Sequence, residues 1–351
     1  MRGTKDGVLR AVLDTMYWSG LYRLMAPKTA GCGVIFMLHR VRPAHPKDAF
    51  APNAALEVTP EFLDGVIRLV KRRGYAIVDL DEAKRRLTSH SRERFAVFTF
   101  DDGYADNFDI ALPLFERHKA PFAVYVTTGM MDGTADIWWL ILEEALAHAQ
   151  SIRTRIGNEE YALPTRTSAE KQAAWDTIYW PLRDISVAER RDCVAALAEA
   201  AGVSIPGIFA AVTVNWPRLR EVAKNPWLTI GAHTLTHPPL AVIEENAARV
   251  EIVESKRRIE AELGKPVRHF AYPFGDHASA GGRDFKLARE AGFDTAVTTR
   301  RGPLFPDHAS HLHALPRVSL NGNFQAMRYT ALFLSGAPFA LWNKGRKLDV
   351  A

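Results

Sequence analysis

The chain has 351 residues, of which 47% are hydrophobic and 24% are charged, and its formal net charge is +5. This composition is typical of a globular protein and excludes a disordered chain, a collagen-like chain and a small disulfide framework. A basic excess this small is no signature of nucleic-acid binding, so we expect no nucleic-acid partner. The two cysteines, Cys32 and Cys193, are far apart in the sequence and belong to no cysteine zinc motif.

Residues 1–32 form the first predicted unit, an amphipathic helical segment. Asp6, Arg10, Asp14 and Arg23 interrupt its apolar residues, which is unlike a secretory signal. A helix packed on the domain is one interpretation, and a helix in a membrane interface is the alternative. No run in the chain reaches the roughly 18 apolar residues of a membrane span. We therefore expect a cytoplasmic protein, with peripheral contact to the inner membrane left open.

Strand and helix patterns alternate over residues 33–135, which we expect to form the first part of an α/β barrel. Apolar runs at 33–38 and 95–100 have the length and composition of buried strands. Between them, Thr59 and Pro60 predict a helix start, because threonine caps helices and proline is favoured in the first turn. This alternation is typical of a parallel sheet or barrel. Further strands are expected at 75–80 and 121–128, and helices at 81–87 and 107–118.

Residues 136–215 interrupt this pattern with long helical stretches and few strand signals, and we interpret them as a helical insertion. The alternating pattern resumes over 216–322, the second part of the barrel, and residues 323–351 are expected to be a C-terminal tail. Trp138 and Trp139 are adjacent in a predicted helix, so they point in different directions, and we expect at least one of them in the core. In the second part of the barrel, strands are expected at 227–233, 267–275 and 293–299, and helices near 243–263 and 283–291.

Four groups of polar residues lie at or directly after predicted strands. In α/β barrels, the loops after the C-terminal strand ends build the active site. Taken alone, each group also has an ordinary structural interpretation, as a surface turn, a core or solvated histidine, or a shaped loop. The four groups are Asp101-Asp102-Gly103, His233 with His237, the loop Phe270–Gly275, and His39.

Two of these groups together suggest a metal site. Adjacent carboxylates after an apolar strand are costly to bury unless a cation is near. His233 and His237 are spaced i and i+4, so we expect them on one side of a helical turn, where they can bind one divalent ion. Two histidines and one carboxylate leave coordination positions open for water and substrate.

The motifs TFDDG at 99–103, HTLTH at 233–237 and YPFG at 272–275 occur in this order. Together they resemble the polysaccharide deacetylases, carbohydrate esterase family four with its NodB-homology domain, over residues 33–135 and 216–320. The resemblance implies a distorted (β/α) barrel of the polysaccharide deacetylase type and metal-dependent hydrolysis of an amide.

The resemblance also implies the roles of individual residues. Asp102, His233 and His237 match the metal ligands, and Asp101 matches the catalytic base that takes a proton from the attacking water. Zn²⁺ suits these ligands, and Co²⁺ or Ni²⁺ would fit them too. The backbone N–H of Phe274 matches the donor that stabilises the oxyanion. The expected substrate-binding residues are Tyr104, Tyr272, Pro273, Phe274 and Arg317.

The sequence departs from the family pattern at two positions. Where the family has an arginine that braces the base, this chain has Ala271, and Arg317 is our candidate replacement, with a surface arginine as the alternative. The late histidine motif that supplies the general acid is also unclear. Leu38-His39-Arg40 is similar to an N-terminal element of the poly-N-acetylglucosamine-type deacetylases, so we assign the acid to His39, with His313 as the alternative.

These observations predict N-deacetylation of an N-acetylated sugar in a polysaccharide, oligosaccharide or lipid-linked saccharide, with release of acetate. The alternatives are an O-acetyl esterase and an amidohydrolase or deformylase that acts on a non-polymer substrate, because the same chemistry serves all of them. An inactive carbohydrate-binding protein is disfavoured because the base and all three metal ligands are present. The sequence leaves the sugar and the oligomeric state open.

Overall fold

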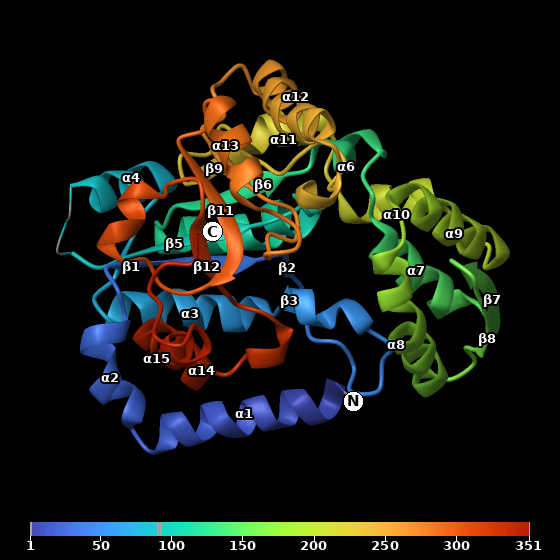
Figure 1. The fold of residues 1–351 in the computed structure, drawn as a ribbon, viewed down its shortest axis with the longest axis horizontal. Coiled ribbons are helices and arrows are strands. Elements are labelled where there is room, and N and C mark those ends of the chain that lie inside the picture. Colours follow the sequence, from blue (N-terminus) through green and yellow to red (C-terminus); the bar gives the residue numbers. More distant parts are fainter. Residues whose placement is uncertain (1, 90, 92, 351) are drawn as a thin grey trace.

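The computed structural model describes residues 2–89, 91 and 93–350, and its centre is a closed barrel of seven parallel strands (Figure 1). The barrel closes where β1 pairs with β5 along its full length. A short strand, β4 (Ala76–Ile77), extends the sheet beyond β5. The predicted α/β barrel is therefore confirmed. In order around the barrel, the strands are β1 (Gly33–Leu38), β12 (Leu315–Ser319), β11 (Thr295–Arg301), β10 (His269–Ala271), β9 (Leu228–Ala232), β6 (Phe122–Val126) and β5 (Phe95–Phe100).

Helices cover the outside of the barrel, and their sequences explain where they begin and end. In α3 (Pro60–Arg72), the Thr59 hydroxyl accepts a hydrogen bond from the Phe62 amide, and Pro60 occupies the first turn, as the sequence predicts. One face of α3, which includes Phe62, Val66 and Val70, is buried against the barrel. The other flanking helices are α4 (Leu80–Thr88), α5 (Leu112–His118), α11 (Trp216–Val222), α12 (Glu245–Leu263) and α13 (Gly282–Glu290).

Alternation along the strands divides their side chains between two layers. Val34, Phe36 and Leu38 of β1 belong to the large core between the barrel and the helices. Ile35 belongs to a second cluster, which fills the barrel with residues such as Val97 and Tyr125. Because successive side chains point to opposite faces of a strand, residues in step with Ile35 and Val97 point toward the barrel axis. Residues that continue this alternation beyond the strand ends therefore point toward the mouth of the barrel.

Residues 136–215 form a separate lobe beside the barrel, drawn in green in Figure 1, with a hydrophobic cluster of its own. Besides the helices that we expected in this insertion, the lobe contains an antiparallel hairpin. The hairpin was missed because most of its side chains are exposed and it has no continuous apolar run. Its strands are β7 (Ser151–Ile156) and β8 (Glu159–Pro164), and α6 (Thr128–Asp132) leads into the lobe helices α7 (Trp138–His148), α8 (Ser168–Asp184), α9 (Val187–Ala200) and α10 (Ile205–Val212).

The two ends of the chain pack together on one side of the barrel, below α3 in Figure 1. The N-terminal segment forms two helices, α1 (Arg2–Trp18) and α2 (Leu21–Thr29), separated by Gly20 in the left-handed conformation. The expected C-terminal tail instead contains two largely buried helices, α14 (Met327–Ser335) and α15 (Ala337–Trp342). In the described part of the chain, no single helix is long and apolar enough to cross a membrane, and α9 with α10 reach that size only as a pair bent by 99°.

Candidate active site

Asp101 and Asp102 follow β5 directly and are buried at the mouth of the barrel, with 2% and 3% of their surface exposed. The chain turns sharply here, because Asp102 and Gly103 have φ values of 75° and 84°. A side chain at Gly103 would bring its Cβ within 2.9 Å of Val126 on β6, so only glycine fits this turn. The turn directs two adjacent carboxylates into the interior, where each needs a partner.

Arg317 is the partner of Asp101. Arg317 lies on β12 in step with Leu315, which belongs to the cluster inside the barrel. Its Nη1 and Nη2 atoms donate to the two carboxylate oxygens of Asp101 at 2.7 and 2.6 Å, and its Nε donates to the carbonyl of Thr298. The guanidinium is 1% exposed, so it is not a surface arginine, and it contacts Asp101 as we expected of a replacement for the missing family arginine.

This pairing keeps Asp101 ionised. Burial raises the pKa of the Asp101 carboxyl, but the charges of Arg317 and His233 and the hydrogen bonds from Arg317 outweigh it. The net result is a pKa below the usual value, so the carboxylate is a proton acceptor at neutral pH.

His233 and His237 lie in the loop after β9. Our expectation of a helical turn was wrong, because the segment is an irregular loop in which Thr234 and His237 have φ values of 66° and 69°. Glu251 on α12 fixes this loop by accepting hydrogen bonds from the amides of Leu235 and Thr236, at 2.8 and 2.9 Å, and from the Thr236 hydroxyl. Sequence reasoning missed Glu251, because a single glutamate in a charged helix gives no signal.

The two histidines converge on Asp102. Their Nε2 atoms lie 3.4 and 3.3 Å from its Oδ1, and these three atoms are within 4.8 Å of one another. His233 is oriented by a 2.7 Å hydrogen bond between its Nδ1 and the carbonyl of Ala271. Burial raises the pKa of Asp102, but the close imidazoles of the two histidines hold it well below its usual range.

This cluster fits a divalent cation. Ligand atoms about 2.1 Å from a tetrahedral zinc ion lie about 3.4 Å apart, which agrees with the separations of Asp102 from His233 and His237. The Oδ1 atom of Asp102 is buried and has no well-formed hydrogen bond among the described residues, as expected of an oxygen that serves as a ligand. The donor set of two imidazoles and one carboxylate suits Zn²⁺, Co²⁺ or Ni²⁺.

His39 follows β1 in step with Ile35, and its half-buried ring reaches the same mouth of the barrel. Burial lowers its pKa, while the nearby charges of Asp102 and Asp101 oppose this, and the net pKa lies below the usual value. Its backbone carbonyl accepts a 2.7 Å hydrogen bond from Asn107, and its neighbour Arg40 donates to Asp106 at 2.9 Å. The anchors Asp106 and Asn107 were not predicted from the sequence.

His313, the alternative acid, lies away from this site. It precedes β12 in the chain, so it lies at the opposite end of the parallel barrel from the C-terminal strand ends. Its Nε2 is within hydrogen-bond distance, 2.8 Å, of the carbonyl of Phe293. The positions of the two histidines therefore favour His39 as the proton donor, although its role stays a prediction.

The structure separates the expected substrate-binding residues into two groups. Tyr104 and Tyr272 are fully buried, and their hydroxyls hydrogen-bond to Trp139 and to the carbonyl of His313, so both are framework residues that present no surface to a ligand. Phe274 is half-buried, has a φ of 59°, and its ring centroid lies 5.0 Å from that of His237. Pro273 is buried beside it.

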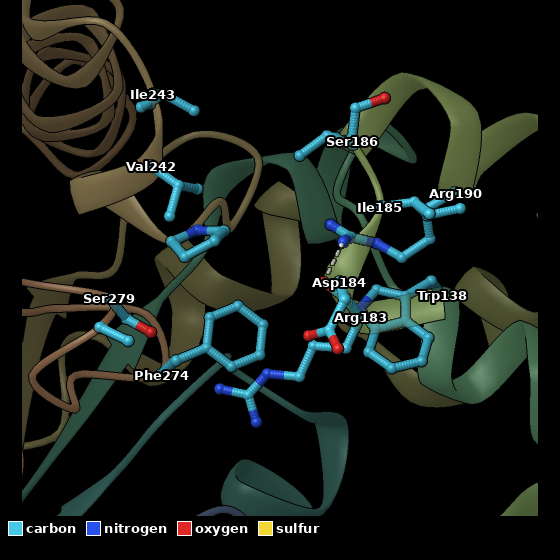
Figure 2. Close-up of a pocket in the computed structure, with 13 residues that line it drawn as sticks. Trp138, Arg183, Asp184, Ile185, Ser186, Arg190, Val242, Ile243, Phe274 and Ser279 are labelled. Carbon is cyan, nitrogen blue, oxygen red and sulfur yellow. Dashed lines mark hydrogen bonds between the residues drawn. The ribbon is translucent and has the colours of Figure 1, made fainter. Parts of the chain in front are cut away.

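A cavity of about 480 Å³ lies beside Phe274, between the barrel and the lobe of residues 136–215 (Figure 2). The lobe contributes Trp138, Arg183 and Asp184 to its lining, and the barrel contributes Phe274 and Ser279. The guanidinium of Arg183 lies over the ring of Phe274 at 5.2 Å. Trp138 is buried, and its indole N–H has no hydrogen-bond partner among the described residues. The cavity therefore combines an aromatic wall with polar groups, as small-molecule sites do.

Backbone strain is concentrated at this mouth of the barrel. Asp102, Thr234, His237 and Phe274 all have positive φ values, which are unfavourable for residues other than glycine. Such strain persists where the surrounding structure enforces it, and it is most common at functional sites. These four residues carry or adjoin the proposed metal ligands, so the local conformations and the chemistry indicate the same site.

The site combines an ion-paired carboxylate with an aspartate–histidine cluster at the C-terminal mouth of a parallel barrel. This arrangement is typical of hydrolytic α/β-barrel enzymes. The sequence model for the polysaccharide deacetylase family matches residues 88–191 and 198–296. The chain therefore belongs to the polysaccharide deacetylase family, whose members are hydrolases of carbon–nitrogen bonds. No curated protein matches the chain.

Solved structures of other deacetylases share the fold. The Streptococcus pyogenes deacetylase PplD, in complex with acetate, is 18% identical with a TM-score of 0.57, over 86% of this chain and 97% of its own. A de-N-acetylase from Aggregatibacter actinomycetemcomitans is 14% identical with a TM-score of 0.54, over 86% and 99%. IcaB from Ammonifex degensii is 15% identical with a TM-score of 0.53, over 87% and 97%. At these identities the similarity establishes the barrel fold.

Proposed function

We propose that this protein removes the N-acetyl group from an N-acetylated sugar in a polysaccharide, oligosaccharide or lipid-linked saccharide, and releases acetate. The observation that carries the proposal is the arrangement at the mouth of the barrel. There, the Asp101–Arg317 pair lies directly beside the cluster of Asp102, His233 and His237. Family membership supports the hydrolytic class, and the de-N-acetylase among the structural neighbours supports an N-acetyl substrate.

Asp102, His233 and His237 would hold the divalent ion, with Zn²⁺ the first choice and Co²⁺ or Ni²⁺ as alternatives. When bound, such an ion supplies a Lewis acid for the amide carbonyl and lowers the pKa of water. The protein contributes a preformed donor set, because His233 is oriented by the carbonyl of Ala271 and the histidine loop is fixed by Glu251.

The remaining steps belong to side chains of this chain. Asp101, kept ionised by Arg317, accepts the proton of the water that attacks the acetamide carbon. The amine cannot leave as an anion, so His39 donates a proton to the nitrogen as the carbon–nitrogen bond breaks. The products are acetate and the free amine of the sugar. The backbone N–H of Phe274, beside His237, is the proposed donor to the oxyanion.

The cavity between the barrel and the lobe offers space for the sugar next to the one that reacts. Phe274 forms both the edge of the active site and the wall of this cavity, so a saccharide bound at the active site would extend into it. The ring of Phe274 can stack on a sugar face, while Arg183 and Asp184 can bind hydroxyl groups.

The experiment that tests this function compares bonds of different chemistry within one saccharide framework. Purified enzyme is incubated with N-acetylated, O-acetylated and N-formylated forms of the same oligosaccharide, and acid release and free amine are both measured. We expect acetate and amine in equal amounts from the N-acetylated form. Acetate without amine would assign the site to an O-acetyl esterase, and selective release of formate would assign it to a deformylase.

A further inference from the structure

The N-terminal helices carry several large apolar side chains that are exposed. On α1, Val8, Val12 and Trp18 are 63%, 51% and 77% exposed. On α2, Leu21 and Leu24 are 47% and 81% exposed. We call these five residues the outer face. Large apolar side chains are rarely so exposed together on a protein surface without a partner.

The outer face is not needed to attach α1 to the rest of the protein. A different stripe of this helix, Leu9, Leu13 and Met16, packs into the main hydrophobic core. At about 100° per residue, Trp18 lies opposite this stripe, whereas Val8 and Val12 lie on its flank. Exposed apolar side chains therefore remain on α1 outside the stripe that the fold buries.

The charges around the outer face are positive. Arg10, Arg23 and Lys28 are all exposed on the same two helices. The one acidic residue between positions 7 and 30 is Asp14, and its carboxylate is paired with Arg328 at 2.6 Å. Apolar side chains flanked by exposed basic residues are complementary to the surface of an anionic bilayer, where tryptophan also prefers to lie.

We propose that the outer face of α1 and α2 binds the surface of an anionic lipid bilayer. The two helices lie in the headgroup region, with Trp18, Leu21 and Leu24 inserted at the acyl boundary and the basic side chains against lipid phosphates. This proposal does not depend on the reaction that the barrel catalyses.

The N-terminal part of α1 lies near the catalytic end of the barrel. A cavity of about 570 Å³ is lined by Leu9 of α1 and Trp342 of α15, and by Met37, Arg301 and Ser319, which lie near or at the C-terminal ends of their strands. Asp101 follows the same end of β5. Leu9 belongs to the buried stripe of α1, and α2 ends at Thr29, shortly before β1 begins at Gly33. Trp18, Leu21 and Leu24 therefore lie toward the other end of the barrel, so a bilayer on the outer face leaves the active-site end open.

Vesicle flotation of the full-length protein tests the proposal. Vesicles of phosphatidylcholine alone are compared with vesicles that also contain phosphatidylglycerol. We expect the wild type to float with the anionic vesicles, and the bound fraction to fall about tenfold or more with neutral vesicles. Two double variants test the apolar and the basic residues separately. The first combines Trp18→Glu with Leu24→Glu, and the second combines Arg10→Glu with Arg23→Glu. In each, the fraction bound to anionic vesicles should fall by a similar factor.

The matched control is Val250→Glu, which places the same charge at an apolar residue that is 52% exposed on α12, across the barrel in Figure 1. This variant should float like the wild type, and all variants should keep the wild-type melting temperature. The proposal is overturned if the wild type does not float with anionic vesicles, or if the Trp18/Leu24 variant floats as well as the wild type. Sedimentation velocity tests the alternative occupant. If the wild type does not float but forms a dimer that the Trp18/Leu24 variant abolishes, the outer face binds a second copy of the chain.

Discussion

Asp101 and Arg317 are 216 positions apart in the sequence, yet they form a two-pronged ion pair inside the barrel. Neither residue is stable there without the other, because an unpaired buried charge costs several kcal/mol. The pair orients the carboxylate and holds its pKa down, so the carboxylate is ionised and can accept a proton at neutral pH.

Replacing Arg317 with methionine should raise the pKa of Asp101, because burial then acts without an opposing cation. The acidic limb of the kcat/KM profile should move to higher pH by about 1–3 units. In the wild type the folded-state pKa of Asp101 is lower than in the unfolded chain. The pair therefore stabilises the fold above about pH 4, and this contribution is lost as the pH falls through the folded value.

In Arg317→Lys, which keeps the charge but not the two-pronged geometry, the acidic limb should move less than in the methionine variant. Identical acidic limbs in the wild type and the methionine variant would exclude Arg317 from control of the base.

Replacing His39 with alanine should reduce turnover by about 10²-fold or more and remove the basic limb of the pH profile, because the proton donor is lost. Metal content should stay unchanged, since His39 is not among the three candidate ligands. His313→Ala is the matched control and should change turnover little, because His313 lies at the opposite end of the barrel. If the alanine variant of His313 is the impaired one, the assignment of the acid is wrong.

At the scale of elements, the histidine loop owes its shape to its neighbours. Glu251 of α12 holds it from one side. On the other side, the amides of Gly129 and Asp136 donate to carbonyls of Leu235 and Thr236, at 2.7 and 2.9 Å. A loop with strained residues at Thr234 and His237 would relax without these contacts. Helix α12 and the start of the lobe therefore position the metal ligands without contacting a metal.

Glu251→Ala should weaken metal binding by about 10–100-fold, the usual effect of losing a supporting hydrogen-bond partner. Isothermal titration of the metal-free protein with Zn²⁺ measures this directly. The control is Glu254→Ala, one turn along the same helix, where an exposed carboxylate pairs with Arg257 and does not contact the loop. Equal affinities in the wild type and the Glu251 variant would show that the loop keeps its shape without this support.

Arg190→Ala should lower the free energy of unfolding, measured by urea denaturation, by about 3–5 kcal/mol. Arg190 and Asp136 form a buried ion pair at 2.6 Å between α9 and the segment that leads into α7, so the substitution removes the close partner of a buried charge. Its neighbour Arg191 is more exposed and lies 3.9 Å from the same carboxylate, so Arg191→Ala should cost about 1 kcal/mol or less. Similar losses of unfolding free energy in the two variants would contradict the assignment of Arg190 as the main partner of Asp136.

At the scale of the whole molecule, the sequence predicts local features well and distant contacts poorly. The barrel strands are visible because each is a short apolar run, and Asp101, Asp102, His233 and His237 are visible because strand ends carry function in this fold. Asp106 was missed because its partners, Arg40 and Val41, are brought near only when β1 pairs with β5. Glu251 was missed because a single glutamate in a charged helix gives no signal. The hairpin of the lobe and the helices α14 and α15 were missed for a related reason. The hairpin is mostly exposed, so its apolar pattern is weak. Gly336 and Pro338 divide the C-terminal segment into two short helices that depend on packing for their stability.

The most direct test of the proposed function measures metal content and acetate release together, on the wild type and on Asp101→Asn, with one N-acetylated oligosaccharide. We predict a stoichiometric divalent metal in both proteins, because Asp101 is not among the three candidate ligands. We also predict rapid acetate release by the wild type and a loss of about 10²–10⁴-fold in the variant, because asparagine cannot accept the proton of the attacking water. Near-normal turnover in the variant, or a metal-loaded wild type that releases no acetate from any N-acetylated saccharide, would contradict the proposed function.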